Sequence, residues 1–291
     1  MVQQITGFFR RLTLVPQGIT IVIAAFLPIF AIVSMFPALP GIIGHFSDHP
    51  DARDLVPLMV SEPGLTIALV APFAGYFVDR FGRLKLLVWA TFFYGVFGVA
   101  PFFLDDLTQL FASRLGLGVC EAFILTIVNT LIGDYWDDTG RRDWLFLQGI
   151  VGPFLASGVI LVAGPATELR WNGIFLVYGV AFIIFIAMKL FLFEAKGDLG
   201  GKAAANPAAP AAATPFPTAA VLSIAAVTLF ASALYYVFII SGSLVFQQVG
   251  VMEPSAISEM TAGPSLCVML GAVLFRLLSR FSNAVKLGAF F

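Results

Sequence analysis

Residues 75–85 read GYFVDRFGRLK, and they join two long apolar segments at 62–78 and 84–104. A bilayer core about 30 Å thick is crossed by roughly 20 apolar residues in a helix. Both segments have this length and character, which predicts two transmembrane helices. We therefore expect residues 75–85 to turn the chain around at one face of a membrane.

The composition of the whole chain supports a membrane protein. Of its 291 residues, 59% are hydrophobic and only 11% are charged, whereas soluble domains carry about 45–50% apolar and about 25% charged residues. A soluble enzyme and a disordered chain are excluded, because a chain with so few charged residues could not cover its surface in water. A nucleic-acid-binding protein is excluded as well, because phosphate binding needs clustered positive charge. The two cysteines, Cys120 and Cys267, lie in apolar runs, so neither a disulfide framework nor a thiolate metal site is expected. The lipid bilayer is the expected partner.

Eight apolar runs are long enough to cross a bilayer, and their length indicates helices rather than barrel strands. They lie at 18–43, 62–78, 84–104, 109–132, 144–164, 172–192, 219–246 and 259–278. An Ala-, Pro- and Gly-rich stretch at 194–218 has the composition of a semi-rigid linker. We therefore predict an all-α polytopic membrane protein with a six-helix bundle at 1–193. Residues 219–291 would form an incomplete second bundle, with two helices and the start of a third helix.

The basic residues predict the orientation of these helices. With the N-terminus in the cytoplasm, thirteen of the sixteen lysines and arginines fall on the cytoplasmic side, where positive charge is favoured. These are Arg10, Arg11, Arg80, Arg83, Lys85, Arg141, Arg142, Lys189, Lys196, Lys202, Arg276, Arg280 and Lys286. We expect a multi-pass protein of the plasma (inner) membrane.

Two ionisable residues lie inside the fourth apolar run. Arg114 and Glu121 are seven residues apart, which on a helix is a rotation of about 700° and a rise of about 10.5 Å. Both side chains should therefore face the same way, with Asn129 loosely on that side. Charged groups at membrane depth are costly and are functional candidates by default. The alternative is a buried pair that only fixes helix packing.

The loop at 75–85 has a specific pattern, G-x-x-x-D-R-x-G-R-x-K. Gly75 would permit a close approach of helices, Gly82 would relieve the turn, and the cations would anchor the loop at the cytoplasmic face. The pattern resembles the motif between the second and third helices of the major facilitator superfamily of transporters. Its members here are Gly75, Asp79, Arg80, Gly82, Arg83 and Lys85.

Four further stretches fit the same family in order. SMFPALPGI at 34–42 resembles a proline motif of drug/proton antiporters, and Arg114 to Gly118 resembles an R-x-x-x-G motif. GIVGPFLASG at 149–158, with Gly152, Pro153 and Gly158, partly resembles an antiporter motif, and residues 170–175 resemble the stretch before the sixth helix. LLSRFSNAVKL at 277–287 also echoes FVDRFGRLKLL at 77–87, as two parallel halves would. The family has twelve helices, so the chain is expected to be incomplete at its C-terminus.

The resemblance implies a secondary active transporter that moves a small organic solute by alternating access. The drug/proton branch implies proton-coupled efflux, with Arg114 linked to coupling and Glu121 able to titrate. Asp134 would join Asp79 and Arg83 in a cytoplasmic charge cluster that acts as a gate. Gly152 and Pro153 would form a seal or pivot, or else a region of ordinary close packing with a kink. The proton gradient would drive transport, with no cofactor, and the complete protein would be monomeric.

Three other interpretations remain open. The first is a sugar or organic-acid importer of the same fold, since Arg114 would also receive a carboxylate. The second is an inactive fragment, since the chain has eight of the twelve helices. A membrane-embedded enzyme needs a nucleophile or a metal at membrane depth, but His45 and His49 lie in an outside loop and no metal site is expected. Glu62 follows Ser61 at the expected start of the second helix, where a capping role accounts for it.

Overall fold

The computed structural model describes residues 12–194, 218–251 and 253–278 of the chain. The expected linker and the sequence echo at 277–287 fall almost wholly outside these residues. Eight helical spans within the described part are long and apolar enough to cross a membrane, which confirms the predicted all-α architecture. The elements are α2 (Val15–His45), α3 (Ala52–Phe81), α4 (Arg83–Val99), η1 (Ala100–Phe103), α5 (Leu107–Tyr135), α6 (Asp138–Leu169), η2 (Gly173–Gly179), α7 (Val180–Phe191), α8 (Thr218–Gln248) and α9 (Pro254–Leu278).

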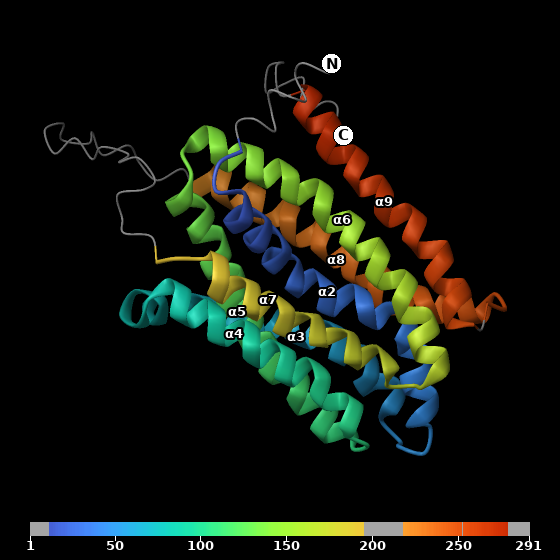
Figure 1. Cartoon of the computed structure of the whole chain (residues 1–291). Coiled ribbons are helices and arrows are strands. Elements are labelled where there is room, and N and C mark those ends of the chain that lie inside the picture. The colour runs from blue at the N-terminus through green and yellow to red at the C-terminus, as the bar shows by residue number, and fades with distance from the viewer. Residues whose placement is uncertain (1–11, 195–217, 252, 279–291) are drawn as a thin grey trace, which may run out of the picture.

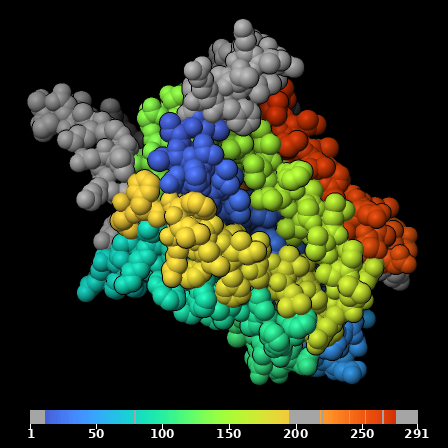
Figure 2. Space-filling model, viewed as in Figure 1, coloured from blue at the N-terminus to red at the C-terminus, as the bar shows by residue number. Residues whose placement is uncertain are grey.

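Helix α2 is the centre of the assembly. It contacts α3, α5, α6, α7, α8 and α9, and 78% of its most apolar window is buried, against 56% or less in every other span. Figure 1 shows α4 at one edge of the bundle and α9 at the opposite edge, beside α6. In the space-filling view α2 is visible between α6 and α7 (Figure 2). The first apolar run is therefore a core helix. It packs on α3, α5, α6 and α7 of the first helix group (α2 to α7) and on α8 and α9, which form the second helix group.

Helix α3 begins ten residues before the predicted start. Residues 52–61 include Arg53, Asp54 and Pro57, which lower the hydropathy of this stretch. The helix nevertheless continues through it, because Val56, Met59 and Val60 are buried in the core. Glu62 consequently lies about 15 Å along the helix rather than at its first turn. The interpretation of Glu62 as a helix cap is therefore wrong.

The turn between α3 and α4 consists of one residue, Gly82. Its φ angle of 88° lies in the left-handed region that favours glycine, as the turn at 75–85 required. The Glu194 carboxylate, beyond the end of α7, accepts hydrogen bonds from the backbone N–H groups of Arg83 (2.9 Å) and Leu84 (3.0 Å). It thereby caps the positive end of the α4 dipole. A Cβ added at Gly75 would meet no described atom within 4 Å, so the close approach expected there is wrong.

The second helix group is joined to the first mainly through α6 and α9. A Cβ added at Gly164 would lie 2.6 Å from the Pro254 carbonyl oxygen and 2.7 Å from Ser255 Cα. Near the middle of the contact, the Ser157 hydroxyl donates a 2.9 Å hydrogen bond to the Ala262 carbonyl. Gly164 therefore lets the two helices meet at the end where α6 stops and α9 starts.

The glycines that the sequence motif singled out on α6 do not make this contact. A Cβ added at Gly152 or Gly158 would meet nothing within 4 Å among the described residues, whereas one at Gly149 would lie 3.2 Å from Ala272 Cβ. A methyl group would therefore find open space at both positions within the described structure, and neither glycine is required for the α6–α9 contact. The seal-or-pivot interpretation stays a prediction.

We expect Gly164→Ala to lower the melting temperature of the purified protein, because the added methyl group would overlap backbone atoms of α9. Overpacking of this kind costs about 1–3 kcal/mol. Gly158→Ala, on the same helix with open space around it, is the matched control and should leave the melting temperature unchanged or raise it. Equal melting temperatures for the two variants, measured by scanning fluorimetry in detergent, would contradict the packing described here.

Candidate functional site

Arg114 is buried in the bundle with only 2% of its surface exposed. Its Nη1 donates a 3.1 Å hydrogen bond to the Tyr178 hydroxyl, and its Nη2 approaches the carbonyl oxygens of Phe97 (3.4 Å) and Gly98 (3.5 Å). The guanidinium also lies over the rings of Phe175 (5.2 Å) and Tyr178 (5.0 Å), where cation–π attraction stabilises it. Within the described residues no carboxylate lies within 4.0 Å of it. Neutral groups therefore hold the arginine, and its positive charge is not locally cancelled.

Tyr178 of η2 positions the guanidinium of Arg114 through its hydroxyl group. Its hydroxyl lies 3.0 Å from the Ser34 hydroxyl of α2 and 3.3 Å from the Ala31 carbonyl oxygen. Gly98 makes room for the ring, since a Cβ there would lie 2.6 Å from Tyr178 Cβ. The sequence analysis missed Tyr178. The available signal was its spacing of three residues from Phe175, which puts both aromatic rings on one helical face.

Glu121 is also buried, with 1% of its surface exposed. It lies two turns after Arg114 on α5, and the two charges interact electrostatically without a direct ion pair. Its Oε1 is buried and has no hydrogen-bond partner. A carboxylate in this position is destabilised unless it gains a proton, a cation or a donor. The spacing on α5 thus brings together one unneutralised cation and one unsatisfied acid.

Glu62 joins this group from α3, with 6% of its surface exposed. Its Oε1 accepts a 2.7 Å hydrogen bond from the Thr66 hydroxyl, and its Oε2 is buried without a partner. It interacts electrostatically with both Arg114 and Glu121. The sequence analysis missed this role. An acid followed by an apolar run is ambiguous between a helix start and a mid-helix position, and only the extension of α3 to Ala52 resolves it.

Gly118 explains why α3 lies so near α5. A Cβ added there would be 2.8 Å from Thr66 Cβ and 2.9 Å from Pro63 Cα. These two residues follow Glu62 within the next helical turn of α3, and Gly118 lies between Arg114 and Glu121 on α5. The glycine of the R-x-x-x-G pattern is therefore the position that lets the Glu62 side chain reach the two charges of α5.

Asn129 does not join this cluster. Its side chain is exposed and donates a 2.9 Å hydrogen bond to the Leu125 carbonyl of its own helix. Gly152, Pro153 and Gly158 lie on α6, which packs mainly on α2 and α9. The structure therefore brings together Arg114 and Glu121 of the predicted residues, and it adds Glu62, Thr66 and Tyr178.

A second charged contact lies at the cytoplasmic end of the predicted topology. Arg83, at the start of α4, forms an ion pair with Asp134, near the end of α5, and their side chains are 36% and 23% exposed. Arg80 is exposed and donates a 3.2 Å hydrogen bond to the Tyr76 hydroxyl, and Lys85 is exposed. The Asp79 side chain lies outside the described residues. Arg83 and Asp134 thus form the described part of the expected charge cluster.

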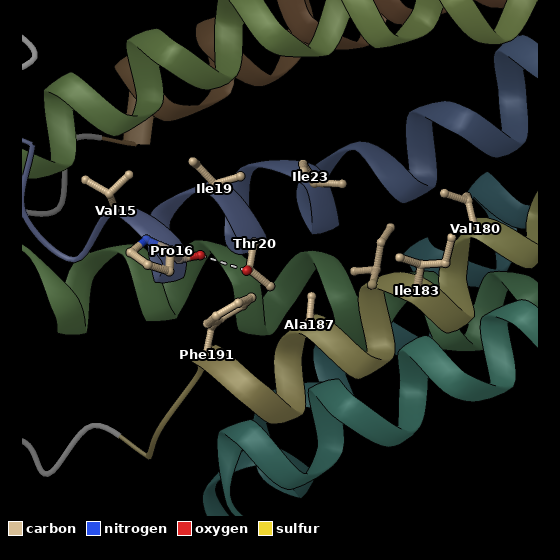
Figure 3. A pocket seen from close by; sticks show the side chains of 10 residues that line it. Val15, Pro16, Ile19, Thr20, Ile23, Val180, Ile183, Ala187 and Phe191 are labelled. Carbon is tan, nitrogen blue, oxygen red and sulfur yellow. Dashed lines mark hydrogen bonds between the residues drawn. The ribbon is translucent and has the colours of Figure 1, made fainter.

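Two grooves on the surface are apolar and separate from these charges. One, of about 480 Å³, lies between α2 and α7, whose side chains face each other across it (Figure 3). Its one hydroxyl, on Thr20, already donates a 2.7 Å hydrogen bond to the Pro16 carbonyl. The other, of about 510 Å³, lies between α4 and α5 and is lined largely by aromatic rings. Neither contains Arg114, Glu121 or Glu62, so the polar site is a buried cluster and not one of these grooves.

The outside-loop histidines do not form a metal site among the described residues, where no group of three potential ligands is found. His45 ends α2 and stacks on the Trp171 ring at 4.0 Å, and its Nε2 lies 3.9 Å from the Asp105 carboxylate. These contacts join the C-terminal end of α2 to the turn before η2 and to the segment between η1 and α5.

We expect Gly118→Ala to lower the melting temperature, because the methyl group would overlap the Pro63 backbone and push α3 away from α5. The cost should be about 1–3 kcal/mol. Gly133→Ala on the same helix is the control, since a Cβ there meets nothing within 4 Å. If Gly118→Ala melts no lower than Gly133→Ala, the close contact between α3 and α5 is refuted.

We expect Arg83→Gln and Asp134→Asn to be coupled in a double-mutant cycle. Each change alone breaks the ion pair, so the double variant should lose less than the two single losses together. The coupling energy should be about 0.2–1 kcal/mol, because both side chains are partly exposed and screened. Chemical unfolding in detergent measures it, and Arg80→Gln with Asp134→Asn supplies the uncoupled control. Additive losses for Arg83 and Asp134 would contradict the contact.

Comparison with known proteins places this arrangement in a family. The sequence model of the Major Facilitator Superfamily matches residues 21–290. Multidrug resistance protein 2 of Bacillus subtilis (strain 168) is 25% identical over 178 residues, which are 60% of this chain and 40% of that protein. Multidrug resistance protein 1 of the same organism is 32% identical over 143 residues, which are 48% of this chain and 34% of that protein. The aligned parts therefore cover less than half the length of either relative.

A solved structure shares the fold. A bacterial homologue of the human lysosomal transporter Spinster, in an inward-facing and occupied conformation, superposes with a TM-score of 0.73 at 15% sequence identity. The match covers 92% of this chain and 62% of that one. The family match along most of the chain, together with the eight apolar helices in this fold, shows that the chain is an integral, multi-pass membrane protein of the major facilitator superfamily of transporters.

Proposed function

We propose that the protein exports a small organic solute in exchange for protons, with Glu121 as the group that takes up the proton and Arg114 as its electrostatic partner. The observation that supports this most directly is the unpartnered, buried Oε1 of Glu121 beside an arginine that forms no ion pair in the described residues. Such a carboxylate oxygen lacks the donor that would stabilise its charge, which suits it to take up a proton.

The depth of Glu121 supports a role in coupling. It lies fourteen residues from each end of α5, which is about 21 Å along the axis in either direction. In transporters built from two bundles, binding sites lie near the bilayer midplane, where access alternates between the two faces. A proton bound at Glu121 would therefore be at the position where its release to one side or the other is controlled.

The neutral surroundings of Arg114 leave its positive charge free to attract the Glu121 carboxylate. Because Tyr178 and two carbonyl oxygens hold the guanidinium, its charge stays available to act on Glu121. A positively charged neighbour favours the ionised carboxylate, while burial favours the protonated one. Opening of the site to water would relieve burial and release the proton, and closure would favour uptake. Rocking of the two helix groups about the α6–α9 contact would produce this alternation.

We propose apolar or amphiphilic compounds as the solute, and the multidrug resistance names of the two relatives support efflux as the direction. Import of an organic acid is less well supported, because both terminal nitrogens of Arg114 already have acceptors and the side chain is 2% exposed. We propose that the Arg83–Asp134 pair and Asp79 form the cytoplasmic gate. We further propose a monomer in the plasma (inner) membrane with a cytoplasmic N-terminus, on the distribution of basic residues.

We expect proteoliposomes that contain the full-length protein to move ethidium against its gradient when a pH gradient is imposed. Glu121→Gln should abolish this pH-driven movement while it preserves exchange of ethidium for ethidium, because the amide keeps the shape of the carboxyl but binds no proton. Glu259→Gln, which removes an exposed acid on α9, is the control and should behave as the parent protein.

Two results would overturn the proposal. If the imposed pH gradient changes the transport of neither ethidium nor any lipophilic amine of a test panel, proton coupling is rejected altogether. Unchanged pH-driven movement in Glu121→Gln would assign Glu121 to helix packing alone.

A further inference from the structure

The buried cluster contains two acids and one base. Glu62 on α3 and Glu121 on α5 both interact electrostatically with Arg114, and they also interact with each other. Among the described residues, Arg114 is the cation whose charge acts on both carboxylates. With all three groups ionised, the cluster carries one negative charge in excess at membrane depth, where an uncompensated charge is expensive.

The hydrogen bonds leave room for one more positive charge. Thr66 satisfies one oxygen of Glu62, but the acceptor atoms Glu62 Oε2 and Glu121 Oε1 are buried without hydrogen-bond partners among the described residues. Buried polar atoms are nearly always paired in folded proteins. Two unsatisfied acceptors on two carboxylates that act on each other therefore indicate that a proton is missing from this cluster rather than that packing is poor.

Other titratable groups face the cluster but carry no charge at neutral pH. Tyr94 on α4, Tyr178 in η2 and Cys120 on α5 interact with Glu121. Tyr236 on α8 also interacts with Glu121, and its hydroxyl would lie 3.0 Å from a Cβ added at Gly64 of α3. None of them supplies the missing positive charge, and Tyr236 places the cluster beside the contact between α3 and α8.

We propose that Glu62 and Glu121 share a single exchangeable proton, so that Glu62 is a second coupling group equal in importance to Glu121. Uptake forms one O–H bond, on Glu62 Oε2 or Glu121 Oε1, with a proton drawn from water, and the cluster becomes neutral. Release returns that proton to water and restores the excess negative charge. The inference rests on the proposed proton-coupled function, and it adds α3, which contacts α8, to the elements that sense protonation.

The shared proton has a specific experimental signature. Infrared difference spectra of the full-length protein in detergent, recorded during an alkaline titration, should show loss of one protonated-carboxyl C=O band. In Glu62→Gln the charge of the remaining Glu121 is balanced by Arg114, so Glu121 should stay ionised and the band should be absent from the start of the titration. Glu121→Gln should lack the band as well. Glu62→Asp keeps a carboxyl and should keep the band, and Glu259→Gln is the exposed control.

The same variants separate this inference from the proposed function. A full band in Glu62→Gln, with pH-driven ethidium transport retained, would overturn the shared proton while proton coupling through Glu121 stands. Half of the band lost in each single variant would also overturn it, because two independent protons would then be present. Absence of the band and of pH-driven transport in the parent protein would reject the proposed function itself. Glu62→Met is a second neutral replacement, to be used if Glu62→Gln does not give a monodisperse protein.

Discussion

A guanidinium held at membrane depth by neutral groups, without a direct ion pair among the described residues, is the constraint on which the rest of the site depends. Arg114 needs hydrogen-bond acceptors from several elements at once. The Tyr178 hydroxyl of η2 and the carbonyl oxygens near the end of α4 supply them. Tyr178 in turn contacts Ser34 on the central helix α2. Because these partners are neutral, the positive charge survives burial and acts on the acids nearby.

The approach of α3 to α5 converts this single charge into a site. Gly118 has no side chain to keep Pro63 and Thr66 away, so Glu62 comes within reach of the charges on α5. In a bilayer, small residues at helix interfaces allow this close packing, which the hydrophobic effect alone does not drive. The α6–α9 contact uses the same device at Gly164. One contact assembles the acids, and the other joins the two helix groups that would move.

Hydropathy and helical periodicity predicted most of the fold and part of the site. The eight spans, the turn at Gly82 and the burial of Arg114 and Glu121 on one helix follow from local rules of length, dihedral preference and rotation per residue. The same rules failed for Glu62 and Gly75. Each of these depends on a neighbour distant in sequence: whether a glycine is crowded, or an acid is capped or buried, depends on which helix lies against it.

The sequence by itself determined that this chain crosses a membrane as helices, that it resembles major facilitator transporters, and that α5 carries a cation and an acid on one face. These are properties of single segments and of their spacing. Only the tertiary structure decided that Arg114 is held by Tyr178, that Glu62 joins Glu121, and that Gly164 forms the contact between helix groups. The physical reason is that charge balance and close packing are set between helices, by distances that no single segment contains.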